Sequence, residues 1–302
     1  MAEIHQMILM HGIDSVRRQA VTKRERQVAD AAYAVLSEDA DRIGFTYSGF
    51  ALTSLPHKDV GGSSWKREGH NLTLLLESGK DVHTGQLLGL PHGSYARFIL
   101  LFLQTEAIKK GSREIELGRS MRVWMGSMGL SIGGATYKKV SEQAKRISAC
   151  RLTFARSFGG AEVRHNGAFV STAITMSSVS DDRQASLWSD KVILDETFYK
   201  ALRDHPVPVS ESALRAIGPR SLVIDLYIWL AYRLHSLRDS VEVGWPALQR
   251  QFGADYARAR RFREYFLECL ELALAAYPEA RVSLGDRGLV LHPSRPAVAQ
   301  AV

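Results

Sequence analysis

The sequence predicts an α+β protein of two tandem winged-helix domains, each a helix-turn-helix followed by a β-hairpin, behind an N-terminal helical extension. Three observations predict this fold. One order of elements, helix–strand–helix–turn–helix–hairpin, occurs twice along the 302 residues. The strands of the two copies start at residues 113 and 240 and the hairpins at 152 and 281, so the offsets, 127 and 129, nearly agree. The excess of positive charge falls in the same part of both copies.

The predicted domains follow from changes in composition along the chain. Residues 1–45 form the basic extension, in which the run RRQAVTKRER at 17–26 leads into a helix that ends near Leu36. Residues 46–203 form the first winged-helix domain with a preceding strand, LTLLLE, and loops that carry the turn signals LPHKD and GGSS. Residues 204–295 form the second domain, and residues 296–302 a tail.

The first copy begins with a helix that starts after Ser94 and stops at Gly111, a residue suited to a helix C-terminus. A short strand (113–117) and two amphipathic helices separated by the turn GLSIGG follow. The residues expected on the apolar faces of these two helices are Met121, Trp124, Met125, Met128, Tyr137, Val140, Ala144 and Ile147. Strands come next, and the pair Asn166-Gly167 predicts a hairpin turn between them.

The second copy repeats the order of elements but not the residues. Pro219 precedes a helix over SLVIDLYIWLAYRLHSL, and the strand SVEV leads to a short helix over 246–252. A longer helix, RARRFREYFLECLELALAAY, follows the turn GADYA and ends before a hairpin around residues 285–288. The residues that we expect on its core-facing side are Phe262, Phe266, Leu270 and Leu274.

The distribution of charge indicates a polyanionic partner. The net charge is +7, of which residues 133–165 carry +5 and residues 249–263 carry +4, leaving −2 for the rest of the chain. Charged residues also cover the solvent face of any helix, but such faces mix signs, whereas these segments do not. Both segments contain the second helix of a helix-turn-helix, the element that enters the major groove of DNA. The sequence therefore predicts contact with double-stranded DNA.

The residues that we expect to contact DNA form two sets. In the first copy they are Thr136, Lys138, Lys139, Gln143, Lys145, Arg146, Arg151 and Arg164. In the second copy they are Arg250, Arg258, Arg260, Arg261 and Arg287. Thr136, Lys139, Gln143 and Arg146 lie opposite the apolar face of their helix and are expected to read bases, while Lys138 and Lys145 hold phosphates. Arg164 and Arg287 belong to the expected hairpin wings. Two recognition helices predict an asymmetric site of about two helical turns.

The stretch GLSIG, residues 129–133, matches the G-x-S-x-G motif that presents a nucleophilic serine in α/β-hydrolases. That motif needs a buried strand before the serine and a buried helix after it. Here the preceding run has helical periodicity with Arg119 and Arg122, and the following run is basic. We therefore expect Ser131 to be a turn residue, and a serine hydrolase is the least favoured alternative.

Other features set limits on the class of protein. Cys150 and Cys269 are too few for a disulfide scaffold and fit a reducing cytoplasm. The most apolar run, Leu222–Leu230, is too short to span a bilayer, and no secretory signal is apparent, so no membrane association is expected. Phosphate-loop, H-E-x-x-H and C-x-x-C patterns are missing from the sequence, and we expect no cofactor, metal or catalytic residue.

A series of motifs in fixed order resembles the RepA-type plasmid replication initiators. It comprises LPHKD, W-x-R-x-G at 65–69, LTLLLE, LGLPHGSYARFILLFLQTEAIK, SREIELG and GGATYKKVSEQAKRI. The resemblance runs from about residue 50 through at least residue 200 and continues more weakly toward the C-terminus, while the basic first forty residues lie outside it.

The resemblance implies an iteron-binding initiator that is not an enzyme. Such proteins bind direct repeats in a plasmid origin, distort or open the adjacent duplex, and recruit the host initiator, helicase and polymerase. Their monomers commonly bind DNA, while homodimers limit copy number or repress their own gene. Two alternatives stay open on the sequence: a tandem winged-helix transcriptional regulator, and a scaffold without sequence preference.

Overall fold

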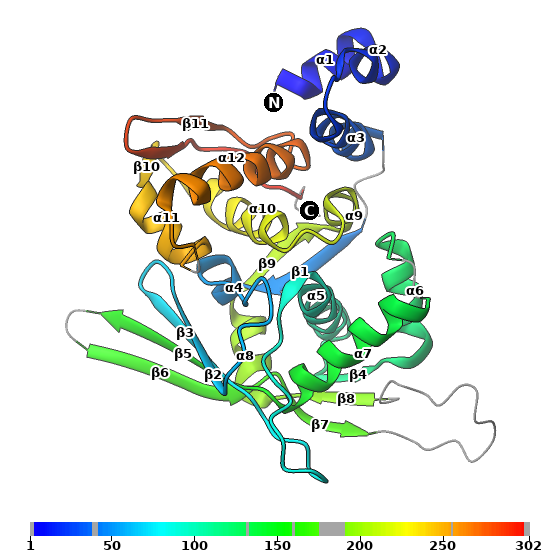
Figure 1. Ribbon diagram of the computed structural model, residues 1–302, viewed down its shortest axis with the longest axis vertical. Helices are drawn as coiled ribbons and strands as arrows, with labels where there is room; N and C mark the ends of the chain where they lie inside the picture. Colours follow the sequence, from blue (N-terminus) through cyan, green and yellow to red (C-terminus); the bar gives the residue numbers. More distant parts are fainter. Residues whose placement is uncertain are drawn as a thin grey trace. The chain divides into compact units, whose positions relative to one another are not determined.

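The computed structural model describes residues 3–37, 42–130, 133–158, 161–174, 191–254 and 256–298 as a mixed helix and sheet protein (Figure 1). The chain divides into two compact units. The terminal unit consists of Met1–Gly44, Phe50–Leu52 and Val207–Val302, and the central unit of Phe45–Gly49 and Thr53–Pro206. The boundary runs through β1 (Ile43–Tyr47) and α4 (Ser48–Leu52) and falls just after the first residue of β9 (Pro206–Ser210).

The central unit combines helices with two antiparallel sheets. Its helices are α5 (Gly93–Lys110), α6 (Gly118–Ser127), α7 (Gly134–Ala149) and α8 (Glu196–Asp204). Its strands are β2 (Ser64–Glu68), β3 (Leu72–Glu77), β4 (Glu114–Glu116), β5 (Arg151–Phe158), β6 (Ala161–Ala168), β7 (Val170–Ile174) and β8 (Lys191–Leu194). One sheet has the order β2-β3-β5-β6 and the other β4-β8-β7.

Helix α5 forms the core of the central unit because it is apolar on nearly every side, as expected for a buried helix. Phe98 and Phe102 of α5 lie 6.2 and 5.6 Å, centroid to centroid, from Trp124 of α6. The helix ends at Gly111, whose φ of 61° is the left-handed conformation that glycine adopts at low cost. The start and end of this helix were predicted from the sequence within one or two residues.

The terminal unit brings together both ends of the chain. Its helices are α1 (Glu3–His11), α2 (Ile13–Gln19), α3 (Lys23–Ser37), α9 (Glu211–Ile217), α10 (Ser221–Leu234), α11 (Trp245–Phe252) and α12 (Ala259–Ala275). Its remaining strands are β10 (Val241–Gly244), β11 (Val282–Leu284) and β12 (Gly288–Leu291), in the antiparallel order β10-β12-β11.

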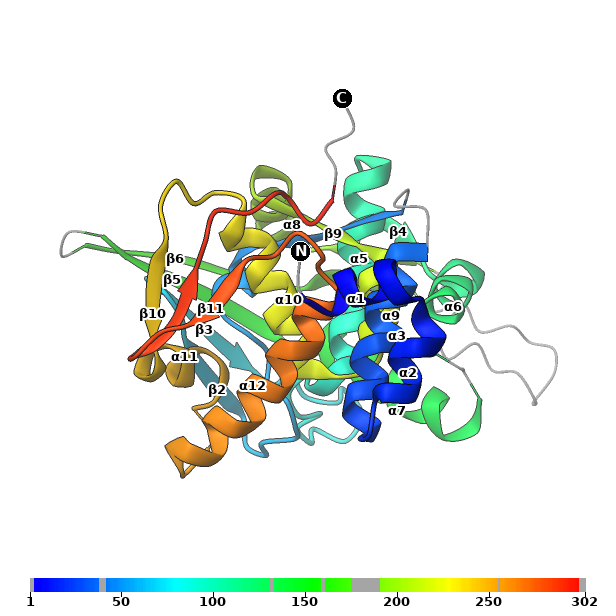
Figure 2. The ribbon, with the colours of Figure 1, turned by 90° about the horizontal axis from the view of Figure 1, so that it is seen from above.

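Helices α1 to α3 pack into the terminal unit, although the sequence suggests a separate extension over residues 1–45. Helix α3 lies against α9 and α12 (Figure 2), where Arg24 pairs with Glu268 at 3.1 Å and with Glu271 at 3.3 Å. The buried His5 joins its Nε2 atom to the carbonyl oxygen of Ala275 at 2.8 Å. The buried face of α3 is rich in alanine, and these small side chains let the helix pack closely against α9 and α12. No local sequence pattern predicts this packing.

The two three-stranded sheets share one strand order. In the central unit, β4 precedes the consecutive helices α6 and α7 and pairs with β8, which also pairs with β7. In the terminal unit, β10 precedes α11 and α12 and pairs with β12, which also pairs with β11. By this order, β7 and β8 correspond to β11 and β12. Residues 175–190, which connect β7 to β8, lie outside the described part of the chain.

The hairpin β5–β6, which the sequence presents as the wing of the first copy, extends the four-stranded sheet instead. Its leucine-rich partner β3 explains this, because Leu74 and Leu76 pair in register with Phe154 and Leu152, and all four are buried. The prediction of a turn at Asn166-Gly167 is wrong: both residues lie within β6. Asn166 Oδ1 accepts a hydrogen bond from Thr153 Oγ1, and Gly167 leaves room for the carboxylate of Asp195.

Candidate nucleic-acid interface

Helix α7 presents lysines to solvent along the part of the chain with the largest positive charge. Val140 and Ile147 of this helix are buried, as the apolar stripe predicts. Lys138, Lys139 and Lys145 are exposed, and Thr136 is half-buried. The helix therefore offers three cations that can contact phosphates or bases.

Gln143 and Arg146 do not lie on that exposed surface, which corrects their prediction as base readers. Only 4% of Gln143 and 9% of Arg146 is exposed. The Arg146 guanidinium donates to Leu90 O at 3.1 Å, to Asp59 Oδ2 at 2.9 Å and to Glu142 Oε1 at 2.5 Å. Gln143 Oε1 accepts a hydrogen bond from the backbone nitrogen of His92 at 2.8 Å. Both side chains hold loops against α7 instead of facing a partner.

The loops that cover α7 come from the two Leu-Pro-His segments of the sequence, 55–57 and 90–92. Gly93 N donates to Pro56 O at 2.9 Å, so the two segments lie together. Arg97 of α5 donates to Leu55 O and Pro56 O at 2.8 and 3.1 Å. Two arginines from two helices, Arg97 and Arg146, therefore hold this double loop.

The ion pair with Arg146 affects the ionisation of Asp59. The hydrogen bond from the Arg146 guanidinium, and a second from the backbone nitrogen of Gly61, hold the pKa of this carboxyl below its usual range. Gly89, beside the pair, has a φ of 84°, and a Cβ there would lie 2.8 Å from Arg146 Nη1. Glycine at residue 89 therefore leaves room for the guanidinium and adopts the left-handed backbone at low cost.

Helix α12 of the terminal unit presents a row of exposed arginines at its N-terminal end. Phe262, Phe266 and Leu270 are buried, as predicted, and Leu274 is half-buried. The exposed cations are Arg260, Arg261 and Arg263 of α12, Arg258 directly before it, and Arg250 in the last turn of α11. Arg260 forms an ion pair with Glu264, with 2.9 Å between Nε and Oε1, whereas Arg261 forms no ion pair within the described residues.

A hollow of about 730 Å³ lies between the first turns of α11 and α12 and the turn of the hairpin β11–β12. Arg263 stacks on the ring of Trp245 there, 4.6 Å from its centroid, so both residues belong to this surface. Neither residue was predicted to contact DNA, because no local pattern pairs residue 245 with residue 263.

Arg287, predicted as a wing residue, is 84% exposed at the edge of this hollow. Its Nη2 atom lies 3.0 Å from Glu242 Oε2, and its backbone nitrogen donates to Glu242 Oε1 at 3.1 Å. These hydrogen bonds lower the pKa of Glu242, which keeps the carboxylate charged beside the arginine. The turn of the hairpin is therefore fixed to β10, and the charge of Arg287 is partly neutralised.

Arg151 and Arg164 belong to the four-stranded sheet, and Arg151 begins β5 two residues after the end of α7. Arg164 pairs in register with Ala155 and Arg151 with Ala168, so the two arginines share one sheet face. Arg164 forms an ion pair with Glu162. The placement of Arg164 on a wing is wrong, since β6 belongs to the four-stranded sheet.

The remaining predictions concern catalysis, metals and membranes. Ser131 lies outside the residues that the structure describes, so the hydrolase alternative gains no support from it. Among the residues with described positions, no three His, Cys, Asp or Glu side chains gather closely enough to hold a metal ion. Nor does this part of the chain contain a helix with the length and apolar character needed to cross a bilayer.

The comparison with protein families matches residues 90–245, more than half of the chain, to the family described as plasmid encoded RepA protein. The chain belongs to the plasmid-encoded RepA family. This membership places the RepA-family chain among plasmid replication initiators in general, as its motifs predict. The matched region contains α5 to α10 and thus the exposed lysines of α7.

Two solved structures, both of domains 2 and 3 of RctB, are similar to this RepA-family chain at 12% sequence identity. One, a selenomethionine derivative, has a TM-score of 0.47 and covers 72% of this chain and 81% of its own. The other has a TM-score of 0.49, with 80% and 94% covered. A search of curated proteins finds no match.

Proposed function

We propose that this RepA-family chain initiates plasmid replication by binding direct repeats of double-stranded origin DNA through two winged-helix units. One observation carries the proposal: a helix, a strand and two consecutive helices follow one another in both units, and that strand joins a three-stranded sheet with the same strand order in each. In the central unit, β5 and β6 come between the second helix and the last two strands of that sheet. In a winged helix, the second of the two consecutive helices enters the major groove. That helix is α7 in one unit and α12 in the other, and both present exposed cations.

The proposed contacts follow from which cations face solvent. Thr136 and Lys139 of α7 and Arg258 and Arg261 of α12 read or clamp the duplex. The proposed phosphate contacts are Lys138, Lys145, Arg151, Arg164, Arg250, Arg260, Arg263 and Arg287. Since each recognition helix covers one major groove, the bound site spans about two helical turns.

The later steps of initiation belong to the same proposal. Bound repeats lead to distortion or opening of the adjacent duplex and to recruitment of the host initiator, helicase and polymerase. The chain acts as a binding protein without catalysis of its own, and homodimers limit copy number. Membership of the RepA family supports this assignment over a transcriptional regulator.

The proposal is tested by measuring binding to a duplex that carries the plasmid's direct repeats and to an unrelated duplex of equal length. Lys139→Ala and Arg261→Ala should each weaken repeat binding by about 1–3 kcal/mol if they read bases. Each phosphate contact removed should also reduce the slope of log affinity against log salt by about 1. Lys66→Ala and Lys23→Ala, at exposed lysines outside the proposed contacts, serve as matched controls.

Equal affinity of the wild-type chain for repeat and unrelated duplexes would contradict the proposal and favour a scaffold. Specific binding without support of a plasmid that carries the repeats would assign the chain to transcriptional regulation instead. Replication of that plasmid, lost in the Lys139→Ala Arg261→Ala double variant and retained in both lysine controls, is the expected result.

A further inference from the structure

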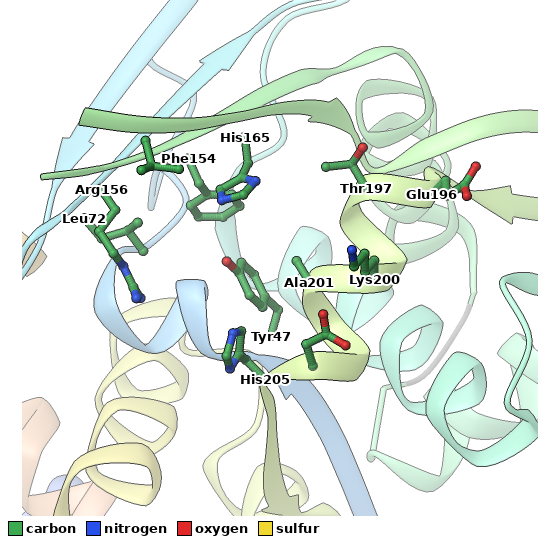
Figure 3. A pocket seen from close by; sticks show the side chains of 12 residues that line it. Tyr47, Leu72, Phe154, Arg156, His165, Glu196, Thr197, Lys200, Ala201 and His205 are labelled. Atoms are coloured by element: carbon green, nitrogen blue, oxygen red, sulfur yellow. The ribbon is translucent and has the colours of Figure 1, made fainter. Parts of the chain in front are cut away.

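A cavity of about 530 Å³ lies in the central unit between the strands β5 and β6 and the helix α8 (Figure 3). It is distinct from the exposed surfaces of α7 and α12, because neither helix contributes a residue to its walls. Its volume is within the range of small-molecule sites, which hold a ligand the size of a nucleotide.

One wall of the cavity is aromatic and apolar. Tyr47 and Phe154 pack edge to face with 5.1 Å between ring centroids and an interplanar angle of 81°, and Tyr47 also contacts Phe198 at 6.2 Å. Tyr47, Phe154 and Phe198 are each buried, so the cluster is packed into the interior of the unit. The exposed imidazole of His165 lies next to Phe154 in Figure 3, at the surface of the same wall.

Two cationic side chains flank this wall. Arg156 of β5 and Lys200 of α8 lie on opposite sides of Tyr47, and the imidazole of His205 lies below the tyrosine ring in the view of Figure 3. Lys200 is exposed and forms no ion pair within the described residues. Its charge is therefore available to a ligand in the cavity.

The acidic residues of the lining already have cationic partners. Glu196 lies 3.8 Å from Arg113, and Asp204 lies 3.9 Å from Arg203, and neither arginine lines the cavity. Both pairs are long and exposed, so they offset the two carboxylates only in part. Arg156 and Lys200 supply the positive charge that an anion in the cavity would meet.

We propose that this cavity binds a nucleotide, with the planar base against His165 and the aromatic wall and the phosphate between Lys200 and Arg156. Imidazole and guanidinium groups stack on bases as aromatic rings do, and charge-assisted hydrogen bonds to phosphate are among the strongest available in proteins. A free nucleotide and a nucleotide within a single strand share this chemistry. The inference does not rest on duplex binding, since its residues are separate from those of the proposed interface.

The test measures binding of two fluorescent probes to the full chain: ATP labelled with N-methylanthraniloyl on the ribose, and a fluorescein-labelled oligothymidylate of about 12 nucleotides. The variant Lys200→Glu should raise the dissociation constant at least about 10-fold, because it reverses the charge next to the phosphate. His165→Ala should raise it by a similar factor through loss of stacking. The probe that binds more tightly identifies the source of the nucleotide.

Lys80→Glu is the matched control, because Lys80 is exposed in the central unit, forms no ion pair within the described residues and does not line the cavity. It should change nucleotide affinity less than about 2-fold, and Lys200→Glu should leave repeat-duplex affinity unchanged. Three results would overturn the inference: no binding of either probe at about 1 mM, equal losses in Lys200→Glu and Lys80→Glu, or displacement of the label by inorganic phosphate as readily as by unlabelled ATP.

Discussion

Arg146 sits on a helix whose lysines face solvent, yet its own guanidinium lies among the backbone and side-chain oxygens of two loops. At the scale of single residues, this arginine is a structural cation that positions the double loop and α7. Its side chain is 11% exposed, while those of its partners Asp59 and Glu142 are about half exposed. Its removal therefore breaks hydrogen bonds to two half-exposed carboxylates and one to the buried carbonyl oxygen of Leu90.

Arg146→Ala should lower the free energy of unfolding by about 1.5–3 kcal/mol, because hydrogen bonds to a charged group are lost and Leu90 O loses a donor. Chemical denaturation measures this change, and Lys145→Ala, at the exposed neighbour, should alter it by less than about 0.5 kcal/mol. If Arg146→Ala left stability unchanged but abolished repeat recognition, the residue would be a base reader after all.

Asp59 should make the stability of the chain depend on pH. Its pKa is lower in the folded chain than in the unfolded chain because of the hydrogen bond from Arg146. Such a carboxyl stabilises the fold at pH values above its unfolded pKa, and the contribution is lost as the pH falls through the folded value. We therefore expect the loss to occur below about pH 4.

Between about pH 7 and pH 3, the free energy of unfolding should decrease less steeply in Asp59→Asn than in the wild type. The amide keeps the shape of the side chain but cannot titrate, so it isolates this carboxyl from the other acids. Parallel pH curves for the two proteins would show that Asp59 contributes nothing to acid sensitivity.

Sequence periodicity predicted the apolar face of α7 but misplaced Gln143 and Arg146. Val140 and Ile147 were identified because burial of a helix face repeats every three or four residues. Two partners of Arg146, Asp59 and Leu90, lie 87 and 56 residues away in the sequence. The spacing of residues along one helix cannot predict such distant contacts. A buried arginine and an exposed one look alike in such a pattern.

Among the elements, the two pairs of consecutive helices, α6 with α7 and α11 with α12, were predictable, whereas the strand pairing of the central unit was not. Amphipathic helices and the hairpin β11–β12 follow from local periodicity and turn residues. Local sequence does not show whether β5–β6 or β7–β8 joins the sheet of β4. Strand β5 pairs with β3 and strand β8 with β4, and both pairings depend on contacts between residues distant in sequence. A single hairpin signal, Asn166-Gly167, was therefore misleading.

The turn between α11 and α12 depends on the absence of a side chain at Gly253. A Cβ there would lie 2.1 Å from Cδ2 of Phe262, which is 1% exposed. Gly253→Ala should lower the free energy of unfolding by about 1–3 kcal/mol, because the phenylalanine ring must move within a packed core. Thermal and chemical denaturation both report this change.

Gly126→Ala provides the opposite control, since a Cβ at this exposed position of α6 meets no atom within 4 Å. It should stabilise the helix by about 0.5–1 kcal/mol. Similar destabilisation by both substitutions would mean that the contact with Phe262 does not decide the effect at Gly253.

At the scale of the whole molecule, residues from both ends of the chain build one unit. Deleting residues 1–37 would uncover the surfaces of α9 and α12 that Val28, Ala29 and Ala32 cover. We expect the melting temperature of the shortened chain to fall by roughly 10 °C or more. Arg24→Ala, which removes only the exposed ion pairs with Glu268 and Glu271, should cost less than about 1 kcal/mol. An unchanged melting temperature after the deletion would show that α1 to α3 add no stability.

The terminal unit consists of separate stretches of the chain, so its helices are synthesised at different times. A ribosome releases α3 first and must then translate the entire central unit before α9 and α12 emerge to receive it. The central segment can complete its own core during that interval, because domains fold as units in the order in which they are made. Helix α3 therefore waits for partners that are made after the whole central unit, and the exposed arginines of α12 become part of a folded unit only at that later stage.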